Sequence, residues 1–473
     1  MTNMEAERVE MPEQPAEVRR HNFDEVALGY SEEDAVLEAS RCIRCTRPKC
    51  VTGCPVSVDI PSFIGLITEK KWDAALEKIY ETNMLPSICG RVCPQETQCE
   101  AVCLMNKKGK PIAIGRLERY VADRCRAERA QAGQNAGKTT LPEKNGKKVA
   151  VVGSGPAGLT AAADLAKAGY SVTIYESLHA PGGVLTYGIP AFRLPKDIVR
   201  DEIEGVKRLG VEIRTNNVIG RIRTLKDLSE EYDAVFLGSG AGLPSFAGIE
   251  GENFNGVYSA NEFLTRINLM KAYKDEYDTI IRKGKNVVVV GGGNVAMDAA
   301  RSALRLGADK VTIVYRRGDE DLPARREEIE HAKAEGIEFS FFTNPVRING
   351  DLGDEKVRRF DVVSVECIRT EPGEPDESGR RSPVPIKGSE FTIDADVVII
   401  AIGTSPNPLI FKGTPDLEKG RKGTVAVNDD LQCSLENVFA GGDIVTGAAT
   451  VISAMGAGKK AAASIDAYLK NKA

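Results

Sequence analysis

The sequence predicts an α/β protein with two dinucleotide-binding units that follow a cysteine-rich N-terminal segment. Three observations support this prediction. A glycine-rich strand–helix–strand pattern occurs twice, at residues 147–176 and 285–317, and eight of the 11 cysteines lie between residues 42 and 103. The length of 473 residues also suits about three domains of roughly 150 residues each.

Composition and charge are those of an ordinary globular protein. Hydrophobic residues make up 42% of the chain and charged residues 28%, and the net charge of -5 gives no indication of nucleic-acid binding. The first 20 residues lack the apolar core of a signal peptide, and no apolar run approaches the roughly 18 residues of a membrane span. We therefore expect a cytoplasmic protein without a membrane partner, in which clustered cysteines are metal ligands or redox groups rather than crosslinks.

The N-terminal cysteines form two closely spaced runs. The first is C-x2-C-x4-C-x3-C-P, at Cys42, Cys45, Cys50 and Cys54, and the second is C-x3-C-P-x4-C-x3-C, at Cys89, Cys93, Cys99 and Cys103. Each run approximates the iron–sulfur pattern in which the cysteine before proline serves a second cluster, although the spacing departs from the bacterial ferredoxin run. Two structural zinc sites would also use four thiolates each, so the spacing alone leaves both interpretations open.

A hydrophilic stretch at residues 127–148 is expected to be a linker, and the first nucleotide unit follows it. In "KKVAVVGSGPAGLTAAADLAKAGYSVTIYE" an apolar strand leads through a glycine fingerprint into an Ala/Leu helix and a second strand that ends at Glu176. The glycines allow a tight turn, a close approach to a pyrophosphate and helix packing, while the acid accepts ribose hydroxyls. The predicted binding residues are Gly153, Ser154, Gly155, Pro156, Ala157, Gly158 and Glu176.

The second unit repeats the pattern but differs at the end of its second strand. Its sequence is "KNVVVVGGGNVAMDAARSALRLGADKVTIVYRR". Tyr315 occupies the position that matches Glu176, and Arg316 and Arg317 follow it. Arginines pair with a 2′-phosphate that a carboxylate would repel, so this site is predicted to prefer NADP(H); the alternative is a solvated strand end. The predicted binding residues are Gly291, Gly293, Asn294, Val295, Ala296, Arg316 and Arg317.

Two further glycine-rich stretches, "APGGVLTYGIPAFRLPK" and "NVFAGGDIVTGAATVISAMGAGKKAAASI", complete an arrangement that resembles the two-dinucleotide-domain flavoprotein disulfide-reductase superfamily. The resemblance implies FAD at the first site and NADP(H) at the second, with "VVIIAIGTSPN" as the return crossover, so that the NADP domain is inserted into the FAD domain. It also implies that a helix N-terminus points at the flavin, where its dipole stabilises negative charge. The FAD residues carried over are Gly183, Leu185, Gly442, Asp443, Thr450 and Val451.

Neither nucleotide unit contains the paired cysteines of a disulfide reductase, so the cysteine-rich region is the expected electron outlet, a role that zinc does not serve. The chain resembles the small subunit of NADPH-dependent glutamate synthase and its relatives. These include the large subunit of NADH-dependent reduced ferredoxin:NADP oxidoreductase, archaeal sulfide dehydrogenase and the N-terminal half of dihydropyrimidine dehydrogenase. The stretches that carry the resemblance are "CGRVCPQETQCEAVC", "IGRLERYVAD", "GGVLTYGIPAFRLPK", "SANEFLTRINLMKAY", "GEPDESGRRSPVP" and "FAGGDI".

This resemblance implies an α-helical N-terminal domain with two [4Fe–4S] clusters. Its carry-over assigns Cys42, Cys45, Cys50 and Cys103 to one cluster, and Cys54, Cys93, Cys99 and Glu118 to the other, which leaves Cys89 free. Simple counting would instead use all eight cysteines and leave Glu118 as a surface carboxylate. The resemblance also places Arg193 near the flavin as a catalytic residue, whereas the alternative is a surface arginine paired with Asp197.

The expected fold is therefore an α-helical two-cluster domain at residues 1–140, an FAD domain at 141–275 and 404–473, and an NADP(H) domain at 276–403. Both nucleotide domains are Rossmann-like. The expected activity exchanges hydride between NADPH and FAD and passes single electrons through the clusters.

The destination of the electrons depends on a second redox subunit, so a hetero-oligomer is expected. The segment "SANEFLTRINLMKAY" favours an electron-bifurcating transhydrogenase, in which a small flavoprotein reductase handles NAD and ferredoxin takes part. The alternatives are a glutamate synthase whose large FMN and amidotransferase subunit accepts the electrons, and a non-enzymatic electron relay. The intact fingerprints argue against the relay.

Overall fold

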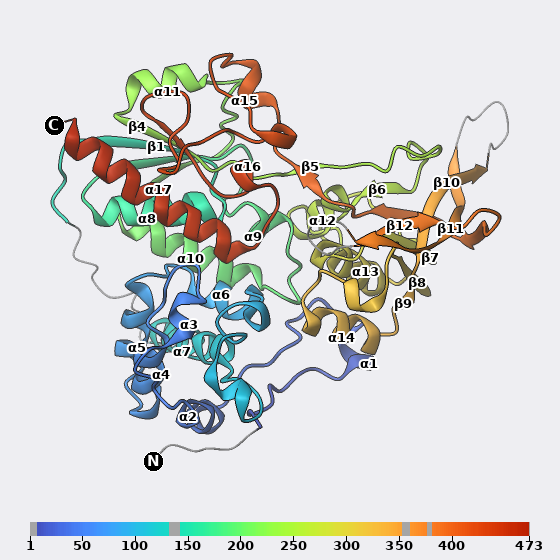
Figure 1. Ribbon diagram of the computed structural model, residues 1–473, viewed down its shortest axis with the longest axis horizontal. Helices are drawn as coiled ribbons and strands as arrows, with labels where there is room; N and C mark the ends of the chain where they lie inside the picture. The colour runs from blue at the N-terminus through green and yellow to red at the C-terminus, as the bar shows by residue number, and fades with distance from the viewer. Residues whose placement is uncertain (1–6, 132–141, 352–359, 376–380, 473) are drawn as a thin grey trace.

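The protein is described by a computed structural model that covers residues 7–131, 142–351, 360–375 and 381–472. An α-helical N-terminal region packs below a first α/β region, and a second α/β region carries an antiparallel extension (Figure 1). Residues 132–141 of the expected linker, the boundary at residue 140 and residues 376–380 of one family stretch lie outside the described ranges. None of the described helices is long and apolar enough to cross a bilayer.

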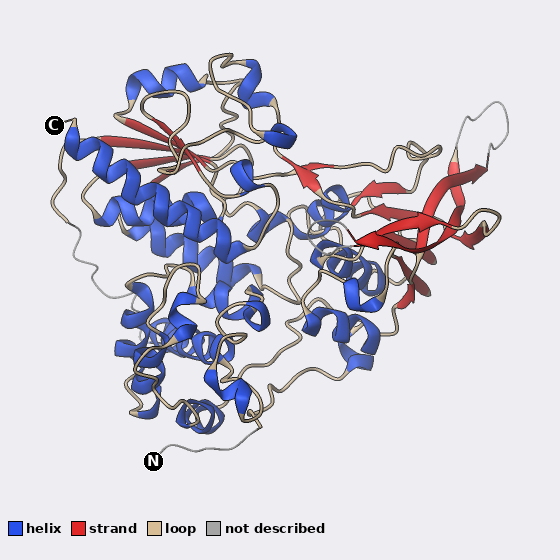
Figure 2. Ribbon diagram, viewed as in Figure 1, coloured by secondary structure: helices blue, strands red, loops and turns tan. Residues whose placement is uncertain are grey.

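The regular secondary structure of the N-terminal region is helical, and Figure 2 shows these helices joined by loops. They are α1 (Ala16–Arg19), α2 (Glu32–Ser40), α3 (Lys49–Thr52), α4 (Ile60–Thr68), α5 (Trp72–Tyr80), α6 (Pro86–Val92) and α7 (Ile114–Gln131), with 3₁₀ turns η1 (Gln95–Thr97) and η2 (Leu104–Lys107). Ser31 and Asp34 start α2 with a capping box, which satisfies two free N–H groups. Phe63, Ile64 and Ile67 on α4 are buried and form part of the core that covers the cysteines.

The first α/β region is a parallel sheet in the order β16-β4-β1-β2-β3. Its strands are β1 (Lys148–Val152), β2 (Ser171–Tyr175), β3 (Glu212–Arg214), β4 (Ala234–Leu237) and β16 (Val438–Ala440). Its helices are α8 (Pro156–Lys167), α9 (Val184–Tyr187), α10 (Lys196–Arg208), α11 (Leu225–Glu231), α15 (Leu409–Lys412), α16 (Asp443–Thr446) and α17 (Val451–Asn471), with the 3₁₀ turn η4 (Arg421–Gly423). Because β16 comes from the end of the chain, this region is split in sequence, as predicted.

The second α/β region is the insertion, a parallel sheet in the order β6-β14-β7-β8-β9. Its elements are β6 (Val257–Ser259), β7 (Asn286–Val290), β8 (Lys310–Val314), β9 (Glu338–Ser340), β14 (Val397–Ile400), α12 (Ala260–Asn268), α13 (Asn294–Arg305), η3 (Asp319–Asp321) and α14 (Arg326–Ala334). Strand β6 pairs with β14, so it belongs to this sheet although the expected boundary at residue 275 assigns it to the first region.

Two smaller sheets complete the fold. An antiparallel sheet projects from the second region and consists of β10 (Thr343–Asp351), β11 (Asp361–Pro375), β12 (Arg381–Pro385) and β13 (Phe391–Asp394). The two segments that cross between the α/β regions pair as β5 (Leu243–Pro244) and β15 (Thr404–Ser405). The sequence analysis did not predict the antiparallel extension.

The segment before α2 connects all three regions. Val26 donates its backbone N–H to the carbonyl of Phe192 at 3.0 Å, next to the first α/β region. Phe23 stacks on Tyr273 with ring centroids 4.2 Å apart, on the side of the second region. Figure 1 shows α1 beside α14. The N-terminal segment therefore holds the second region against the rest of the molecule.

A buried ion-pair network strengthens this junction. Glu335 directly follows α14, is 0% exposed and accepts hydrogen bonds from three arginines. The donors are Arg19 Nε at 3.1 Å, Arg301 Nε at 3.1 Å and Nη2 at 2.8 Å, and Arg305 Nη1 at 2.7 Å and Nη2 at 3.0 Å. Because Arg19 belongs to the N-terminal segment and the other two arginines to α13, one carboxylate joins two regions.

Candidate functional site

The first glycine fingerprint connects β1 to α8 and has the backbone that a bound pyrophosphate needs. Gly153 has φ of +98°, and a Cβ there would lie 2.6 Å from the carbonyl oxygen of Gly238. A Cβ on Gly158 would lie 1.9 Å from the carbonyl oxygen of Gly153, so only glycine allows α8 to pack here. Gly155, in contrast, has nothing within 4 Å of an added Cβ, which leaves open space at the N-terminus of α8.

Glu176 organises the loop around this space. Its buried carboxylate accepts hydrogen bonds from the Ser154 backbone N–H at 3.1 Å and the Ser154 hydroxyl at 2.5 Å. The Ser154 hydroxyl in turn accepts the Gly182 N–H at 2.9 Å. The predicted acid, the fingerprint and the second glycine-rich stretch are thus brought together, and a Cβ on Gly183 would lie 2.9 Å from Gly155.

Asp443 provides a test of whether the site fits FAD. Its Oδ1 atom is buried and has no hydrogen-bond partner among the described residues. Burial raises the pKa of this carboxyl to about 6. An unpaired buried carboxylate oxygen is costly, and the hydroxyl-rich chain of FAD would supply its missing donor. The open N-terminus of α8 and this orphan oxygen together fit the cofactor that the sequence predicts.

The sequence analysis missed Tyr187, which lies in the same site. Burial raises the pKa of its hydroxyl to about 12, and the carboxylates of Glu176 and Asp443 act in the same direction. The charges of both acids therefore act on Tyr187. The only sequence signal for it is an aromatic residue within the glycine-rich stretch at 182–196. Leu185 is buried in the same short helix, α9.

Replacing Asp443 with alanine should weaken FAD binding by about tenfold to a hundredfold, the cost of one hydrogen bond to a charged group. The measurement is FAD retention of the purified variant and its dissociation constant after flavin removal. Asp429 is exposed on the same region, and the matched change Asp429→Ala should leave both values unchanged. Equal FAD affinity in the two variants would contradict this role for Asp443.

The second fingerprint connects β7 to α13 with the same backbone. A Cβ on Gly291 would lie 2.3 Å from the carbonyl oxygen of Ala401, while Gly293 opens onto empty space. Asn294, Val295 and Ala296 begin α13, but the Asn294 side chain already accepts the Arg325 N–H at 2.9 Å. The open space at Gly293 therefore lies next to the backbone N–H groups at the N-terminus of α13, as the open space at Gly155 does at α8.

The arginines expected to select NADP(H) follow β8 directly. Arg316 is exposed, and its guanidinium has no partner among the described residues. Arg317 is half-buried and donates from Nε to the carbonyl of Arg381 at 3.1 Å. Tyr315 is buried beneath the fingerprint, where its ring would lie 2.7 Å from a Cβ on Gly292. An unpaired guanidinium at this strand end fits a 2′-phosphate.

The eight N-terminal cysteines line two separate pockets. Cys42, Cys45, Cys50 and Cys103 line the first pocket, with Ile43, Lys49 and Val102 among its other residues. Cys54, Cys89, Cys93, Cys99 and Glu118 line the second. Ile60 and Ile114 contribute to both pockets, so the two share a wall. The eight cysteines therefore divide between two pockets, and both Cys89 and Glu118 lie at the second one.

The spacing of the sulfurs argues against zinc. Four thiolates around one zinc lie about 3.8 Å apart, given Zn–S bonds of about 2.3 Å. Within the described ranges, which include all eight N-terminal cysteines, no three of these sulfurs lie within 4.8 Å of one another. Burial raises the pKa of the Cys54 thiol to about 11, which favours the protonated thiol where no positive charge is bound. The described cysteines therefore do not form a ready-made site for a single zinc ion.

Glu118 and Cys89 have different surroundings in the second pocket. The Asn83 amide donates to Glu118 at 2.7 Å, and burial raises the pKa of this carboxyl to about 8. The Cys89 sulfur lies 3.7 Å from the side-chain oxygen of Asn83 and 3.5 Å from the sulfur of Met455. Glu118 is therefore buried in α7 and is not the surface carboxylate of the alternative interpretation.

Helix α17 links the FAD site to the second cysteine pocket. Thr450 is its N-cap and accepts the Ser453 N–H at 3.2 Å, while Val451 is its first residue. The next residue, Ile452, lines the second pocket. A Cβ on Gly456 would lie 2.8 Å from the carbonyl oxygen of Pro55, directly after Cys54. The same helix therefore borders both sites.

Arg193 is buried at the junction of the regions. Its Nη1 atom binds both oxygens of Asp298 at 2.8 and 2.9 Å, and its Nε lies 2.9 Å from Glu328. The alternative of a surface pair with Asp197 is wrong, because Asp197 pairs with Arg126 at 3.1 Å. Nearby, Lys196 donates to the carbonyls of Leu185, at 2.9 Å, and Ile189, and burial lowers its pKa to about 7.

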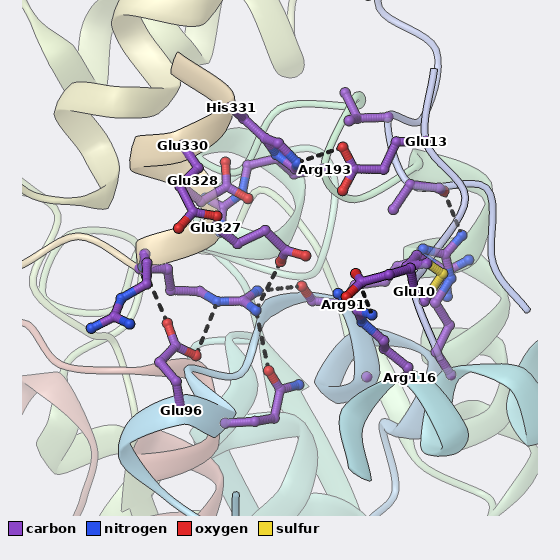
Figure 3. A pocket seen from close by; sticks show the side chains of 18 of the residues that line it. Glu10, Glu13, Arg91, Glu96, Arg116, Arg193, Glu327, Glu328, Glu330 and His331 are labelled. Carbon is purple, nitrogen blue, oxygen red and sulfur yellow. Dashed lines mark hydrogen bonds and ion pairs between the residues drawn. The ribbon is translucent and has the colours of Figure 1, made fainter. Parts of the chain in front are cut away.

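A polar cavity of about 770 Å³ lies between the N-terminal region and α14. Figure 3 shows the charged side chains of both signs that line it. Glu13, Glu327 and His331 have ligand atoms within 4.8 Å of one another. However, Glu13 already pairs with Arg19 at 2.8 Å and Glu327 with Arg325 at 3.0 Å. A cation would have to displace these guanidinium groups. The acidic residues of the cavity are therefore paired with arginines and do not form a metal site.

Comparison with known proteins agrees with this geometry. Residues 19–130 match the family described as "Dihydroprymidine dehydrogenase domain II, 4Fe-4S cluster", and residues 147–458 match "Pyridine nucleotide-disulphide oxidoreductase". FprA of Mycobacterium tuberculosis in complex with NADPH has a similar fold, with a TM-score of 0.57, 23% identity, and coverage of 69% of this chain and 85% of that one. The thioredoxin reductase of T. acidophilum has a TM-score of 0.50 at 22% identity, over 69% of this chain and 100% of that one.

Two curated relatives are more similar in sequence. The glutamate synthase [NADPH] small chain of Escherichia coli is 37% identical over 99% of this chain and 98% of its own length. The NADP(+)-dependent formate dehydrogenase subunit beta of Moorella thermoacetica is 41% identical over 89% of this chain. This chain spans 60% of the length of that subunit.

The fold and the two kinds of site define an NADP-dependent flavin and iron–sulfur oxidoreductase with a pyridine nucleotide-disulphide oxidoreductase module and a 4Fe–4S domain. The predicted fold class and enzyme class are thereby confirmed. The chain belongs to the glutamate synthase small chain family.

Proposed function

We propose that the chain carries electrons between NADPH and a partner redox subunit, by way of FAD and two [4Fe–4S] clusters. The observation that carries this proposal is α17, which begins at the predicted FAD site and borders the second cysteine pocket. Bound FAD would accept a hydride and release its two electrons one at a time. The shared wall of Ile60 and Ile114 then supports an order in which the second pocket is the inner one and the first is the outer one.

The chain's own residues bind and orient the reactants. Glu176 and Asp443 would hold the FAD hydroxyls, and Arg316 and Arg317 would hold the 2′-phosphate of NADPH. The N-terminus of α17, at Thr450 and Val451, would stabilise negative charge near the flavin. Arg193 ties α13, which follows the second fingerprint, to the first region, so we propose that it positions the two sites relative to each other, beside the catalytic role near the flavin that the resemblance implies.

Anaerobic addition of NADPH to the purified protein tests the activity directly. Bleaching of the flavin absorbance, followed by loss of the iron–sulfur absorbance, is the expected result. No bleaching would leave only the electron-relay alternative.

Changing both arginines, Arg316→Ser and Arg317→Ser, should raise KM for NADPH by at least tenfold, because each charge-assisted hydrogen bond contributes about 1.5–3 kcal/mol. The KM for NADH should change little, since NADH lacks the phosphate. The measurement is the rate of anaerobic flavin reduction with each nucleotide. An equal loss with NADPH and NADH would contradict the assignment of these two residues.

The two-cluster proposal predicts about eight iron atoms per chain, four from each [4Fe–4S] cluster. Cys45→Ser and Cys93→Ser should each lose about half of the iron. Glu118 is proposed as the eighth ligand, so Glu118→Ala should lower or alter the signal of one cluster, whereas Cys89→Ser should retain both. Iron analysis and electron paramagnetic resonance of the reduced variants are the measurements. The opposite pattern would make Cys89 the ligand.

Two candidates exist for the partner subunit that exchanges electrons with this chain. The glutamate synthase small chains of Escherichia coli, Halomonas elongata and Azospirillum brasilense are covered by this chain over 95–98% of their own length, which supports a large amidotransferase subunit as the acceptor. The segment at residues 259–273 supports the second candidate, a bifurcating transhydrogenase with a small NAD-dependent flavoprotein. Mass spectrometry of what co-purifies anaerobically from the native cells separates the two, because the partners differ in size and cofactors.

A further inference from the structure

The antiparallel extension contacts the end of β8, where the two arginines proposed to hold the 2′-phosphate lie. Each backbone carbonyl of residues 315–317 accepts a hydrogen bond from the extension or from the turn that leads into it. The three pairs are the Thr343 N–H to Tyr315 at 3.0 Å, the Thr370 hydroxyl to Arg316 at 2.9 Å and the Phe342 N–H to Arg317 at 3.1 Å. The extension therefore fixes the backbone that carries both arginines.

The extension also holds the side chain of Arg317. Its Nε donates to the carbonyl of Arg381, the first residue of β12, at 3.1 Å. Its two Nη atoms have no hydrogen-bond or ion-pair partner within the described part of the chain. A guanidinium that is fixed through Nε keeps both Nη groups for two oxygens of a phosphate. The contact thus orients Arg317 without using the atoms that a phosphate needs.

Phe342 joins these contacts in an unusual backbone conformation. Its φ is +49°, in the left-handed region that a bulky side chain rarely adopts. Its N–H donates to the Arg317 carbonyl, and its own carbonyl accepts the Thr370 N–H at 2.8 Å. Such strain persists only where neighbouring contacts hold it, and it is concentrated at functional sites. The strained residue here connects β11 to the arginines.

Thr370 contacts this strand end through its side chain. It lies on β11, is 5% exposed, and its hydroxyl donates to the Arg316 carbonyl. The Arg316 guanidinium is exposed and has no partner among the described residues, so its position depends on the backbone from which it projects. A hydrogen bond that fixes this backbone therefore limits where the guanidinium can lie.

We propose that Thr370 is a positioning residue that sets the preference of the second nucleotide site for NADP(H). Its hydroxyl holds the strand end so that Arg316 and Arg317 face the same phosphate. This rests on the proposed function, in which these two arginines bind the 2′-phosphate. Thr370 acts through them and not on the nucleotide, so its effect should appear only with ligands that carry this phosphate.

Binding of NADP⁺ and NAD⁺ to the oxidised holoenzyme tests the proposal, because the two nucleotides differ only in the 2′-phosphate. Thr370→Val keeps the branched shape and the backbone N–H but removes the hydroxyl. It should raise the Kd for NADP⁺ by about three- to tenfold, the effect of one hydrogen bond, and leave the Kd for NAD⁺ within about twofold. Thr370→Ser retains a hydroxyl and should bind both nucleotides like the wild type. Isothermal titration calorimetry measures both constants without turnover.

The matched control is Thr312→Val, on β8 itself. Thr312 is 6% exposed, and its hydroxyl makes no hydrogen bond within the described ranges. This variant also removes a buried hydroxyl beside the site, but it should leave both Kd values within about twofold. An equal rise in the Kd for NADP⁺ in the two valine variants would overturn the role of Thr370.

A double-mutant cycle separates this proposal from the proposed function. Adding Thr370→Val to Arg316→Ser/Arg317→Ser should weaken NADP⁺ binding no further, because the threonine acts through these arginines. If the arginine variant binds NADP⁺ like the wild type, the proposed phosphate residues are wrong and the role of Thr370 falls with them. If only the arginine variant loses affinity, if the losses add, or if Thr370→Val weakens NADP⁺ and NAD⁺ equally, the positioning role alone is overturned.

Discussion

Replacing Glu335 with glutamine should lower the free energy of unfolding by about 3–5 kcal/mol, the cost of leaving buried charges without their partner. The carboxylate is fully buried and accepts from Arg19, Arg301 and Arg305. An uncharged amide would leave three guanidinium groups facing one another without this carboxylate, and their side chains are at most 5% exposed. The measurement is the urea midpoint of unfolding by circular dichroism under argon.

The control for this change is the exposed pair of Lys333 and Asp319, whose atoms lie 2.8 Å apart. Asp319→Asn breaks this pair near the same helix and should cost at most about 1 kcal/mol, because water screens both charges. Similar midpoints for the two variants would contradict the structural role of Glu335.

The network also predicts a pH dependence. Burial alone would raise the pKa of the Glu335 carboxyl, but the guanidinium groups of Arg305 and Arg301 lower this pKa to about 2. Since the folded pKa is below the unfolded value of about 4.5, the stabilisation is present above that value and is lost as the pH falls toward 2. The glutamine variant cannot titrate here, so its stability should fall less steeply over the same range.

The sequence allowed prediction of features set by local spacing. The glycines at 153, 155 and 158 and their counterparts at 291 and 293 each determine a turn within a few residues, so the fingerprint and its strands could be predicted from the pattern. The split of the first sheet was predicted from a resemblance to a superfamily. The grouping of cysteines into two pockets also agrees with the resemblance that implied it.

Features set by distant contacts could not be predicted this way. Arg19 and Glu335 are 316 residues apart, and nothing in either local sequence indicates the other. The family resemblance implied that Arg193 lies near the flavin, but its ion pairs with Asp298 and Glu328 depend on how the two α/β regions pack together. Tyr187 was missed for the same reason, because only the fold brings it close to Glu176 and Asp443.

Gly458 is the position where a single side chain should have the widest effect. A Cβ there would lie 2.2 Å from the carbonyl oxygen of Ala157, at the contact between α17 and α8. A Cβ on Gly442 would also lie 3.0 Å from the Cβ of Ala157. Ala157 is thus held between two glycines, and this close contact places both Asp443 and the start of α17 beside the first fingerprint.

Replacing Gly458 with leucine should therefore destabilise the first α/β region by about 3 kcal/mol through overpacking, and it should release FAD. The backbone of Ala157 cannot yield without moving the fingerprint, so α17 must shift instead. That shift separates Ile452 and Gly456 from the second cysteine pocket. Any flavin that remains should still be bleached by NADPH, while reduction of the iron–sulfur centres becomes slower.

Ala463→Leu is the matched control, because Ala463 is exposed on the same helix. It should retain FAD, melt like the wild type and pass electrons at the same rate, as measured by stopped-flow absorbance at the flavin and iron–sulfur bands. If Gly458→Leu behaves like this control, the contact between α17 and α8 does not position the helix. If it loses FAD but reduces its iron–sulfur centres at the wild-type rate in the flavin-loaded fraction, electrons do not pass along α17.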